Sequence, residues 1–485
     1  MPEAAGEDGT PRIAVIGAGA AGLTCAYRLS QAGVAVDVYE RWPGLGGQAA
    51  TLDVGDGLRL ERYYHYLFTS DRALIDLFEE LGLVGILDRH ELRTAIALDG
   101  RIWPFNGALD LLRFRPLPWW TRLRMGAALA WMQLGRGDVT KYERVTARAW
   151  IERMMGRPAW EKVWGPMMRG KFGERADEIS MAWIGDKLLK RRSIREGEAR
   201  QEAFIYPRGG WEPLFQGLAE RIVAAGGRVM IDRPAARVLR EDGSLAVVPA
   251  AAGSFRSGLD PSGFEPDGPP ERYDAVICCV PNDVFAALLD DALAVEVGAE
   301  YLERLESIEY FAAFNLLLEL ERPLTEHFWV NVADRRCPFV GLIEHTNLVG
   351  PQATGGRVFS HVINYLPGDH ELLALDPDAV LDRYEEGLRL LNPGFERSWV
   401  RSRWLFREPS AQPIVGVGYR ERIPSRQTPA SGLMLVNTTQ IYPEDRGTNY
   451  AVRDGTAAAE EVLTGLSDAA RPAATAPRGV ERQAG

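Results

Sequence analysis

The chain has 485 residues and a formal net charge of −11, from 67 acidic and 56 basic side chains. At roughly 150 residues per domain, this length predicts about three folding units or one large interleaved enzyme. A hydrophobic share of 46% and a charged share of 25% exclude a fully disordered or fibrous chain. The acidic balance disfavours nucleic acid as a partner, because nucleic-acid binding depends on basic side chains. Two counts are high, 50 Gly and 13 Trp.

The cysteines and the chain ends indicate in which cellular compartment the protein works. Four cysteines without a C-x-x-C pair predict neither a disulfide framework nor a metal site, as is typical of a reduced, cytoplasmic protein. Residues 1–11 and 467–485 are poor in large apolar groups and predict loose tails, and the first of them lacks the core of a signal peptide. The longest nearly apolar run, 125–134, is about half the length that spans a bilayer.

A strand, a glycine turn and a helix form the first motif. The short apolar run 13–16 predicts a buried parallel strand, and Gly-Ala-Gly-Ala-Ala-Gly at 17–22 follows it directly. A helix is expected over about 20–32 and a second strand over 34–39. This order is typical of a unit that binds a dinucleotide.

The glycines and the acid after the second strand have separate mechanical roles. Gly17 permits the tight turn, Gly19 lets the backbone approach a pyrophosphate, and Gly22 lets the helix pack closely on the strand. The N-terminus of the helix favours the anion. Glu40 stands 18 residues beyond Gly22, where its carboxylate accepts hydrogen bonds from ribose hydroxyls. An acid there disfavours a 2′-phosphate, so NADP is not the expected ligand.

The residues after Glu40 carry a resemblance to a known family. Arg41 follows Glu40, and Gly46-Gly47-Gln48 comes a few residues later. This Glu-x5-Gly-Gly arrangement after the glycine turn resembles the flavin amine oxidase superfamily, which includes protoporphyrinogen oxidases, phytoene-desaturase-type enzymes and UDP-galactopyranose mutase. The resemblance implies noncovalent FAD, with the glycine pair beside its diphosphate and ribityl chain. Most amine oxidases have Arg directly after the glycine pair, where this chain has Gln48.

Two later stretches agree with the resemblance. A buried strand is predicted over 433–436, and a helix with small residues follows Tyr450. In the middle, strands are predicted over 226–231, 236–239 and 273–281. The residues that the resemblance assigns to FAD are Gly17, Gly19, Ala20, Ala21, Gly22, Glu40, Arg41, Gly46, Gly47, Gln48, Val238, Asn437, Asp445, Gly447, Asn449 and Tyr450.

Three side chains are candidates for catalysis. His65, in a polar and aromatic strand expected over 61–68, would hydrogen-bond the flavin or act as an acid or base with a pKa near neutrality. Lys171 would orient a substrate or a water, and Arg446 would hold an anionic substrate or the flavin edge. Structural roles stay open for all three. His65 could be a buried histidine with its hydrogen bonds made, Lys171 an exposed lysine, and Arg446 part of an N-cap or an ion pair.

The resemblance and the pattern together predict an α/β fold. A discontinuous Rossmann-like FAD-binding domain (GR2-type) is expected from 12–89, 201–299 and 431–466. An inserted α+β substrate domain would come from a helical insertion, 90–200, and a mixed region, 300–430. The second FAD-binding stretch includes a loop expected over 250–272, and the mixed region includes strands over 311–320 and 358–365 and a helix over 376–391.

The segment 113–132 combines Trp and Arg with an apolar helical face, which suits a bilayer interface. The hypothesis is peripheral contact with the inner face of a membrane. The alternative is a helix pair packed on the substrate domain with its arginines in water.

The expected function is that of an FAD-dependent oxidoreductase of the dehydrogenase, oxidase or desaturase type. It would transfer a hydride from a C–H bond of a small apolar, polycyclic or isoprenoid substrate to the flavin. The alternatives are a non-redox mutase acting on a sugar nucleotide and a flavoprotein that only binds. Motifs of hydrolases and kinases are absent.

Overall fold

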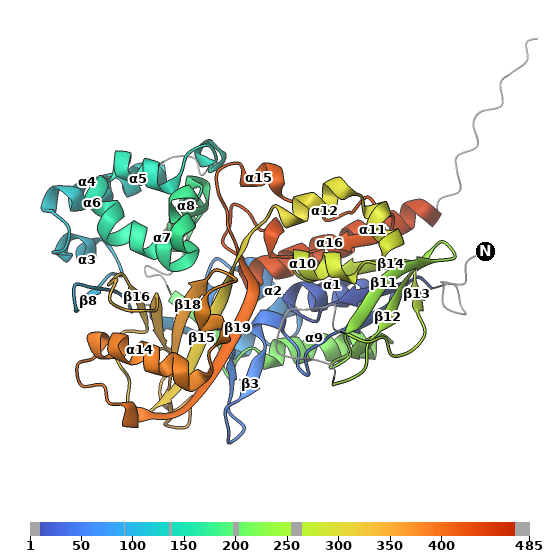
Figure 1. Cartoon of the computed structure of the whole chain (residues 1–485), viewed down its shortest axis with the longest axis horizontal. Helices are drawn as coiled ribbons and strands as arrows, with labels where there is room; N and C mark the ends of the chain where they lie inside the picture. Colours follow the sequence, from blue (N-terminus) through green and yellow to red (C-terminus); the bar gives the residue numbers. More distant parts are fainter. Residues whose placement is uncertain (1–9, 92, 135–137, 197–202, 254–263, 471–485) are drawn as a thin grey trace, which may run out of the picture.

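The computed structural model describes the chain except residues 1–9, 92, 135–137, 197–202, 254–263 and 471–485. A five-stranded parallel sheet forms one end of the molecule (Figure 1). It joins strands from three distant parts of the sequence in the order β10-β2-β1-β14-β20. The strands are β1 (Arg12–Ile16), β2 (Ala35–Tyr39), β10 (Arg228–Met230), β14 (Ala275–Cys278) and β20 (Leu433–Leu435).

Alternate side chains of β1 enter two different cores, as expected for a parallel sheet covered on both faces. Ile13 and Val15 pack toward helices α1 (Ala20–Gln31), α9 (Glu212–Ala224) and α16 (Thr448–Ala470), with α2 (Arg72–Glu80) alongside. Ala14 and Ile16 pack toward an antiparallel sheet and a helix group on the other face. Those elements are β11 (Ala235–Glu241), β12 (Ser244–Pro249), β13 (Glu271–Tyr273), α10 (Asn282–Leu288), α11 (Asp291–Val297) and α12 (Ala299–Glu306).

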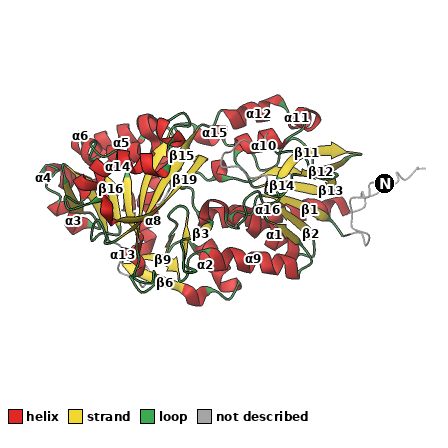
Figure 2. Cartoon of the chain, turned by 60° about the horizontal axis from the view of Figure 1, so that its bottom comes forward, coloured by secondary structure: helices red, strands yellow, loops and turns green. Residues whose placement is uncertain are grey.

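A seven-stranded mixed sheet lies at the other end of the molecule, in the order β19-β15-β18-β17-β16-β7-β8 (Figures 1 and 2). Only the β16–β7 pair is parallel among the described strands of this sheet. Its strands are β7 (Thr94–Leu98), β8 (Arg101–Pro104), β15 (Tyr310–Leu320), β16 (Trp329–Val332), β17 (Gly341–Glu344), β18 (Val358–Leu366) and β19 (Val400–Pro413).

Separate helices cover the two faces of the mixed sheet. Ala95 and Ala97 of β7 face the core of α14 (Pro377–Leu391), whereas Ile96 and Leu98 face a helical cluster. That cluster gathers at one end of the molecule (Figure 1). It consists of α3 (Ala108–Arg113), α4 (Trp119–Leu134), α5 (Ala147–Met154), α6 (Arg157–Ala159), a π-helical turn (Trp160–Trp164), α7 (Gly165–Phe172) and α8 (Met181–Glu196).

Short elements connect the two ends of the molecule. The strands β3 (Thr51–Asp53) and β4 (Arg59–Glu61) form a hairpin, and β9 (Ala203–Pro207) pairs with β5 (Leu67–Phe68) and β6 (Leu87–Glu91). The remaining helices are α13 (His345–Val349) and α15 (Tyr419–Arg422).

The α/β fold class predicted from the sequence is confirmed, and several element predictions need correction. The polar stretch 61–68 is not one strand, because only its ends join β4 and β5. The stretch 273–281 contains parts of two strands, broken at Asp274. The insertion 90–200 is not helical throughout, since β7 and β8 extend the mixed sheet.

At the chain ends, α16 continues to Ala470, beyond the predicted start of the C-terminal tail. Residues 1–9 and 471–485 lie outside the described part of the chain, as do residues 254–263 of the loop predicted over 250–272. The domain boundaries proposed from the sequence stay a prediction.

The packing of α16 on α1 gives a first testable prediction. A Cβ at Gly455 would lie 2.3 Å from the backbone oxygen of Ala21, so Gly455→Ala forces the two helices apart. We expect it to destabilise the protein by about 1–3 kcal/mol in urea unfolding. Gly465→Ala is the matched control on the same helix, where a Cβ meets open space. It should leave stability unchanged or raise it by up to about 1 kcal/mol. Equal stabilities of the two variants would contradict this packing account.

Candidate active site

The turn after β1 is shaped by backbone contacts that exclude side chains. Gly17 has φ +105°, and a Cβ there would lie 2.7 Å from the carbonyl oxygen of Cys279. A Cβ at Gly22 would lie only 1.9 Å from the carbonyl oxygen of Gly17. The roles predicted for these two glycines, a tight turn and close helix packing, therefore match the geometry.

The N-terminus of α1 presents backbone N–H groups at this turn. Its N-cap is Gly19, which has no side chain to cap the helix. The first backbone N–H groups of a helix, here those of Ala20 and Ala21, have no acceptor within the helix. Together with the helix dipole, such groups suit a phosphate.

The glycine pair lies directly against this turn. Gly46 donates its N–H to the carbonyl oxygen of Ala18 at 2.9 Å and forms a parallel bridge with Gly19. Gly46 has φ +105° and Gly47 has φ +58°. A Cβ at Gly47 would lie 3.1 Å from the Cα of Gly19, so the two turns meet without side chains between them. The residues present therefore fit a diphosphate held by backbone on two sides.

Glu40 is buried at the end of β2 and is held by backbone donors. Its carboxylate accepts the N–H of Ala18 at 2.7 Å and the N–H of Trp42 at 2.8 Å. Burial raises the pKa of Glu40, while these two N–H groups and the cations Arg41 and Arg62 favour the charged form. The same carboxylate thus braces the glycine turn, and its contact with a ribose stays a prediction.

Two predicted residues, Lys171 and Asp445, turn out to be each other's partners. The Lys171 ammonium lies 2.6 and 2.5 Å from the two carboxylate oxygens of Asp445. Lys187 of α8 contacts the same carboxylate at 2.7 Å. Burial alone would raise the pKa of Asp445, but the two lysines outweigh it and hold the pKa well below its ordinary value. Burial lowers the pKa of Lys171, and Asp445 opposes that shift.

Arg446 connects the glycine pair to the mixed sheet. It donates to the amide oxygens of Gln48 at 2.8 Å and of Gln412 at 3.1 Å. Its third contact is the hydroxyl of Tyr365 at 3.4 Å. Tyr365 in turn lies 3.2 Å from the hydroxyl of Tyr64. The chain thus brings residues of four distant segments together beside the glycine pair.

His65 is half-buried, and its imidazole is not poised to titrate near neutral pH. Burial lowers its pKa to about 4, which corrects the expectation of a value near neutrality. Its Nδ1 lies 2.8 Å from the carbonyl oxygen of Tyr63, and Trp211 donates to the His65 carbonyl oxygen at 3.0 Å. These contacts match a structural histidine, and the predicted catalytic role of His65 stays a prediction.

The remaining predicted residues have partners within the chain or pack in its core. Val238 is fully buried, and its carbonyl oxygen accepts the N–H of Asp290. Asn437 binds Val280 and Asn282 through its amide nitrogen, and the amide oxygen of Asn449 accepts the N–H of Leu74. The guanidinium of Arg453 lies 5.0 Å from the ring of Tyr450. At Gly447, by contrast, a Cβ would make only ordinary van der Waals contacts with the protein, so the protein's own packing does not require this glycine.

Three residues that complete this site were not predicted from the sequence. Lys187, Tyr365 and Gln412 contact the predicted residues but lie in segments without a recognisable motif. The spacing of Lys187 and Trp183 was the one available signal, because residues four apart share a helix face. The Lys187 ammonium lies 3.7 Å from the Trp183 ring centroid.

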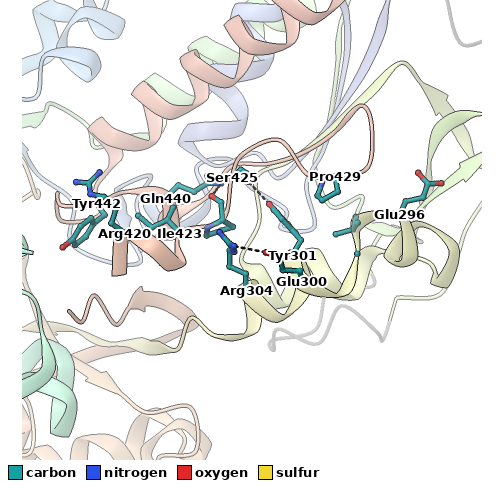
Figure 3. Close-up of a pocket in the computed structure, with 13 residues that line it drawn as sticks. Glu296, Glu300, Tyr301, Arg304, Arg420, Ile423, Ser425, Pro429, Gln440 and Tyr442 are labelled. Atoms are coloured by element: carbon teal, nitrogen blue, oxygen red, sulfur yellow. Dashed lines mark hydrogen bonds and ion pairs between the residues drawn. The ribbon is translucent and has the colours of Figure 1, made fainter. Parts of the chain in front are cut away.

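A surface groove of about 740 Å³ lies elsewhere, between α12 and the segment 420–442 (Figure 3). None of the predicted site residues lines it. Two contacts join residues that line it: Tyr301 donates to the carbonyl oxygen of Ser425, and Arg304 contacts Glu300. We therefore place the functional site at the glycine turns. Within the described residues, no group of three or more His, Cys, Asp or Glu side chains could hold a metal ion.

Comparison with known families agrees with this geometry. The sequence model of flavin-containing amine oxidoreductases matches residues 20–463. That range begins inside the first glycine turn, at Ala20, and contains the glycine pair and the start of α16. The chain therefore belongs to the family of flavin-containing amine oxidoreductases, whose members use a flavin cofactor.

Curated relatives lie on the desaturase side of the family. A 15-cis-phytoene desaturase from Synechococcus elongatus is 26% identical over 65% of this chain and 66% of its own length. A 15-cis-phytoene desaturase from Solanum lycopersicum is 25% identical over 64% of this chain and 53% of its own length. The chain thus spans about half to two thirds of the length of these relatives.

Solved structures share the fold across nearly the whole chain. A protein from Exiguobacterium sp. 255-15, provisionally assigned as a protoporphyrinogen oxidase, has a TM-score of 0.71 at 19% identity and covers 94% of this chain and 99% of its own. At these identities, the likeness shows the fold alone.

Proposed function

We propose that the protein binds FAD noncovalently and oxidises its substrate by hydride transfer. The proposal of FAD rests on one observation: the glycine turn between β1 and α1 and the glycine pair meet backbone to backbone. A Cβ at Gly47 would lie 3.1 Å from the Cα of Gly19. The loop before α16 reaches the same place, because Arg446 contacts Gln48, the residue after the glycine pair. When bound, the flavin supplies the hydride acceptor, and the protein supplies position and electrostatics.

The residues of the chain have three tasks in this proposal. The N–H groups at the start of α1 hold the diphosphate, and Glu40 fixes the glycine turn through Ala18. Arg446 holds Gln48 and Tyr365 at fixed positions next to the glycine pair. The aromatic rings of Tyr64, Tyr365 and Trp183, which lie near one another and near Lys171, would then border the substrate beside the flavin.

An apolar, polycyclic or isoprenoid substrate is the proposed class. The curated relatives are named as desaturases of a carotenoid precursor, which supports C–H oxidation on an isoprenoid scaffold. The aromatic walls beside Lys171 support the same class, because they offer apolar area on either side of a few charged groups.

The direct test is the visible spectrum of the purified protein, followed by anaerobic addition of candidate substrates. We expect a flavin spectrum that bleaches with an oxidisable isoprenoid or polycyclic substrate and recovers with an electron acceptor. A mutase behaves differently: it acts on UDP-galactopyranose only after its flavin is reduced, and it consumes no electrons. A protein without bound flavin, or one active only as the mutase, would contradict the proposed oxidation.

Peripheral contact with a membrane is the proposed role of α3 and α4. Trp119 and Trp120 are 63% and 59% exposed, and the exposed apolar side chains of the two helices continue to Leu109, Leu112, Leu123, Trp131 and Leu134. Arginines at 113, 115 and 122 accompany them, a combination suited to anionic lipid head groups. Figure 1 shows both helices at the end of the molecule far from β13, clear of the glycine turns. No described helix is both long and apolar enough to cross a bilayer, so contact would be peripheral.

Sedimentation with liposomes containing anionic lipid tests the membrane proposal. We expect the detergent-free protein to pellet with these vesicles, and the double variant Trp119→Ala/Trp120→Ala to lose most of this binding. Val295→Ala removes an exposed apolar side chain on α11 instead and should bind as the unchanged protein does. The membrane role fails if the unchanged protein stays in the supernatant, or if both variants bind equally well.

A further inference from the structure

The carboxyl group of Glu408, on β19, has no hydrogen-bond partner and no ion-pair partner among the described residues. Arg41, Arg62, Arg446 and Asp283 nevertheless lie near enough to act on its charge. Arg41 follows the carboxyl end of β2, and Asp283 follows that of β14. The carboxyl of Glu408 therefore faces the crevice at these strand ends, which is the place where parallel α/β sheets bind their ligands.

A buried tyrosine hydroxyl faces the same space. Tyr63 is only 7% exposed, and its ring packs in a small core with Ala313, Ala411 and Phe406. Ala313 pairs with Glu408 across β15 and β19, so this core lies next to Glu408. Among the charged groups near Tyr63, Glu408 acts most strongly on its hydroxyl. Within the described part of the chain, that hydroxyl has no hydrogen-bond partner, although buried hydroxyls are normally paired.

The space between Glu408 and Tyr63 lies beside the glycine pair. Arg62, which directly precedes Tyr63, donates to the carbonyl oxygen of Gly47 at 2.9 Å. The glycine pair presents main chain to a diphosphate, whereas Glu408 and Tyr63 present a carboxyl and a phenol hydroxyl. A diphosphate offers acceptors rather than donors, so these two groups suit the next part of the cofactor, the ribityl chain with its hydroxyl groups.

We propose that Glu408 and Tyr63 bind hydroxyl groups of the ribityl chain of FAD. The inference deepens the proposed function and rests on it, because it assigns two further residues to the same cofactor. A hydroxyl group both donates and accepts, so it satisfies the carboxyl and the phenol together, whether the carboxyl is ionised or protonated. Because Glu408 belongs to the mixed sheet, FAD would also link that sheet to the glycine turns.

The affinities for FAD and ADP test which part of the cofactor the two residues bind. ADP carries the adenosine and the diphosphate of FAD but neither the ribityl chain nor the flavin ring. The FAD affinity is measured from the rise in flavin fluorescence when the holoprotein is diluted, and the ADP affinity from the displacement of FAD. We expect Glu408→Ala to weaken FAD binding about tenfold and Tyr63→Phe to weaken it several-fold. Both variants should bind ADP as the unchanged protein does.

Analogues of FAD that each lack one ribityl hydroxyl separate the chain from the flavin ring. Removing the contacted hydroxyl should weaken binding to the unchanged protein and add little to the loss in Glu408→Ala, because the two changes remove the same hydrogen bond. Glu408→Gln keeps an acceptor oxygen and should lose less affinity than Glu408→Ala. Glu300→Ala removes a carboxylate that is 90% exposed on α12 and should change neither affinity.

The outcomes separate the two proposals. FAD affinity that both crevice variants leave unchanged, or an equal loss of FAD and ADP affinity, would overturn the binding of the ribityl chain and leave the proposed function standing. FAD that responds as expected but is reduced by none of the substrates would support the binding of the ribityl chain and contradict the proposed oxidation. An unchanged protein that binds no FAD would contradict both.

Discussion

The backbone of Gly47 passes so close to that of Gly19 that a Cβ at Gly47 would lie 3.1 Å from the Cα of Gly19. This close approach constrains the structures around it. Gly46 donates a hydrogen bond to Ala18, and the Glu40 carboxylate accepts hydrogen bonds from Ala18 and Trp42. Arg62 donates to the carbonyl oxygen of Gly47 at 2.9 Å. A diphosphate needs a binding surface made of main-chain atoms, whereas an ordinary packed core has no need of one.

A second organising feature is the group of charged residues around Asp445, in the loop that precedes α16. Asp445 and Arg446 come from the loop between β20 and α16, Lys171 and Lys187 from the helical cluster, and Tyr365 and Gln412 from the mixed sheet. One loop therefore ties together the two ends of the molecule, which α-helices and sheets otherwise build separately (Figure 1). Because both lysines share the carboxylate of Asp445, they fix this loop electrostatically.

Features that depend on residues close in the sequence were predicted correctly, whereas contacts between residues far apart in the sequence were missed. The β1–α1–β2 unit, the glycine pair and the long strands β15 and β18 follow local patterns, and all were located correctly. The partnership of Lys171 with Asp445 spans 274 residues, and no periodicity or motif encodes it. His65 shows the same limit: its type suggested acid–base chemistry, but the burial that lowers its pKa to about 4 comes from the packing around it. The joining of β7 and β8 to strands of the 300–430 region likewise depends on long-range pairing.

The central claim is that the close approach of the two glycine turns exists for FAD, and the FAD content of two purified variants tests it most directly. Gly47→Val and Gly57→Val both place a branched residue at positive φ, but a Cβ at Gly47 meets the Gly19 turn and a Cβ at Gly57 meets open space. The account predicts that Gly57→Val keeps the FAD content of the unchanged protein, whereas Gly47→Val is purified folded and nearly free of FAD. FAD retained equally by both variants would contradict it.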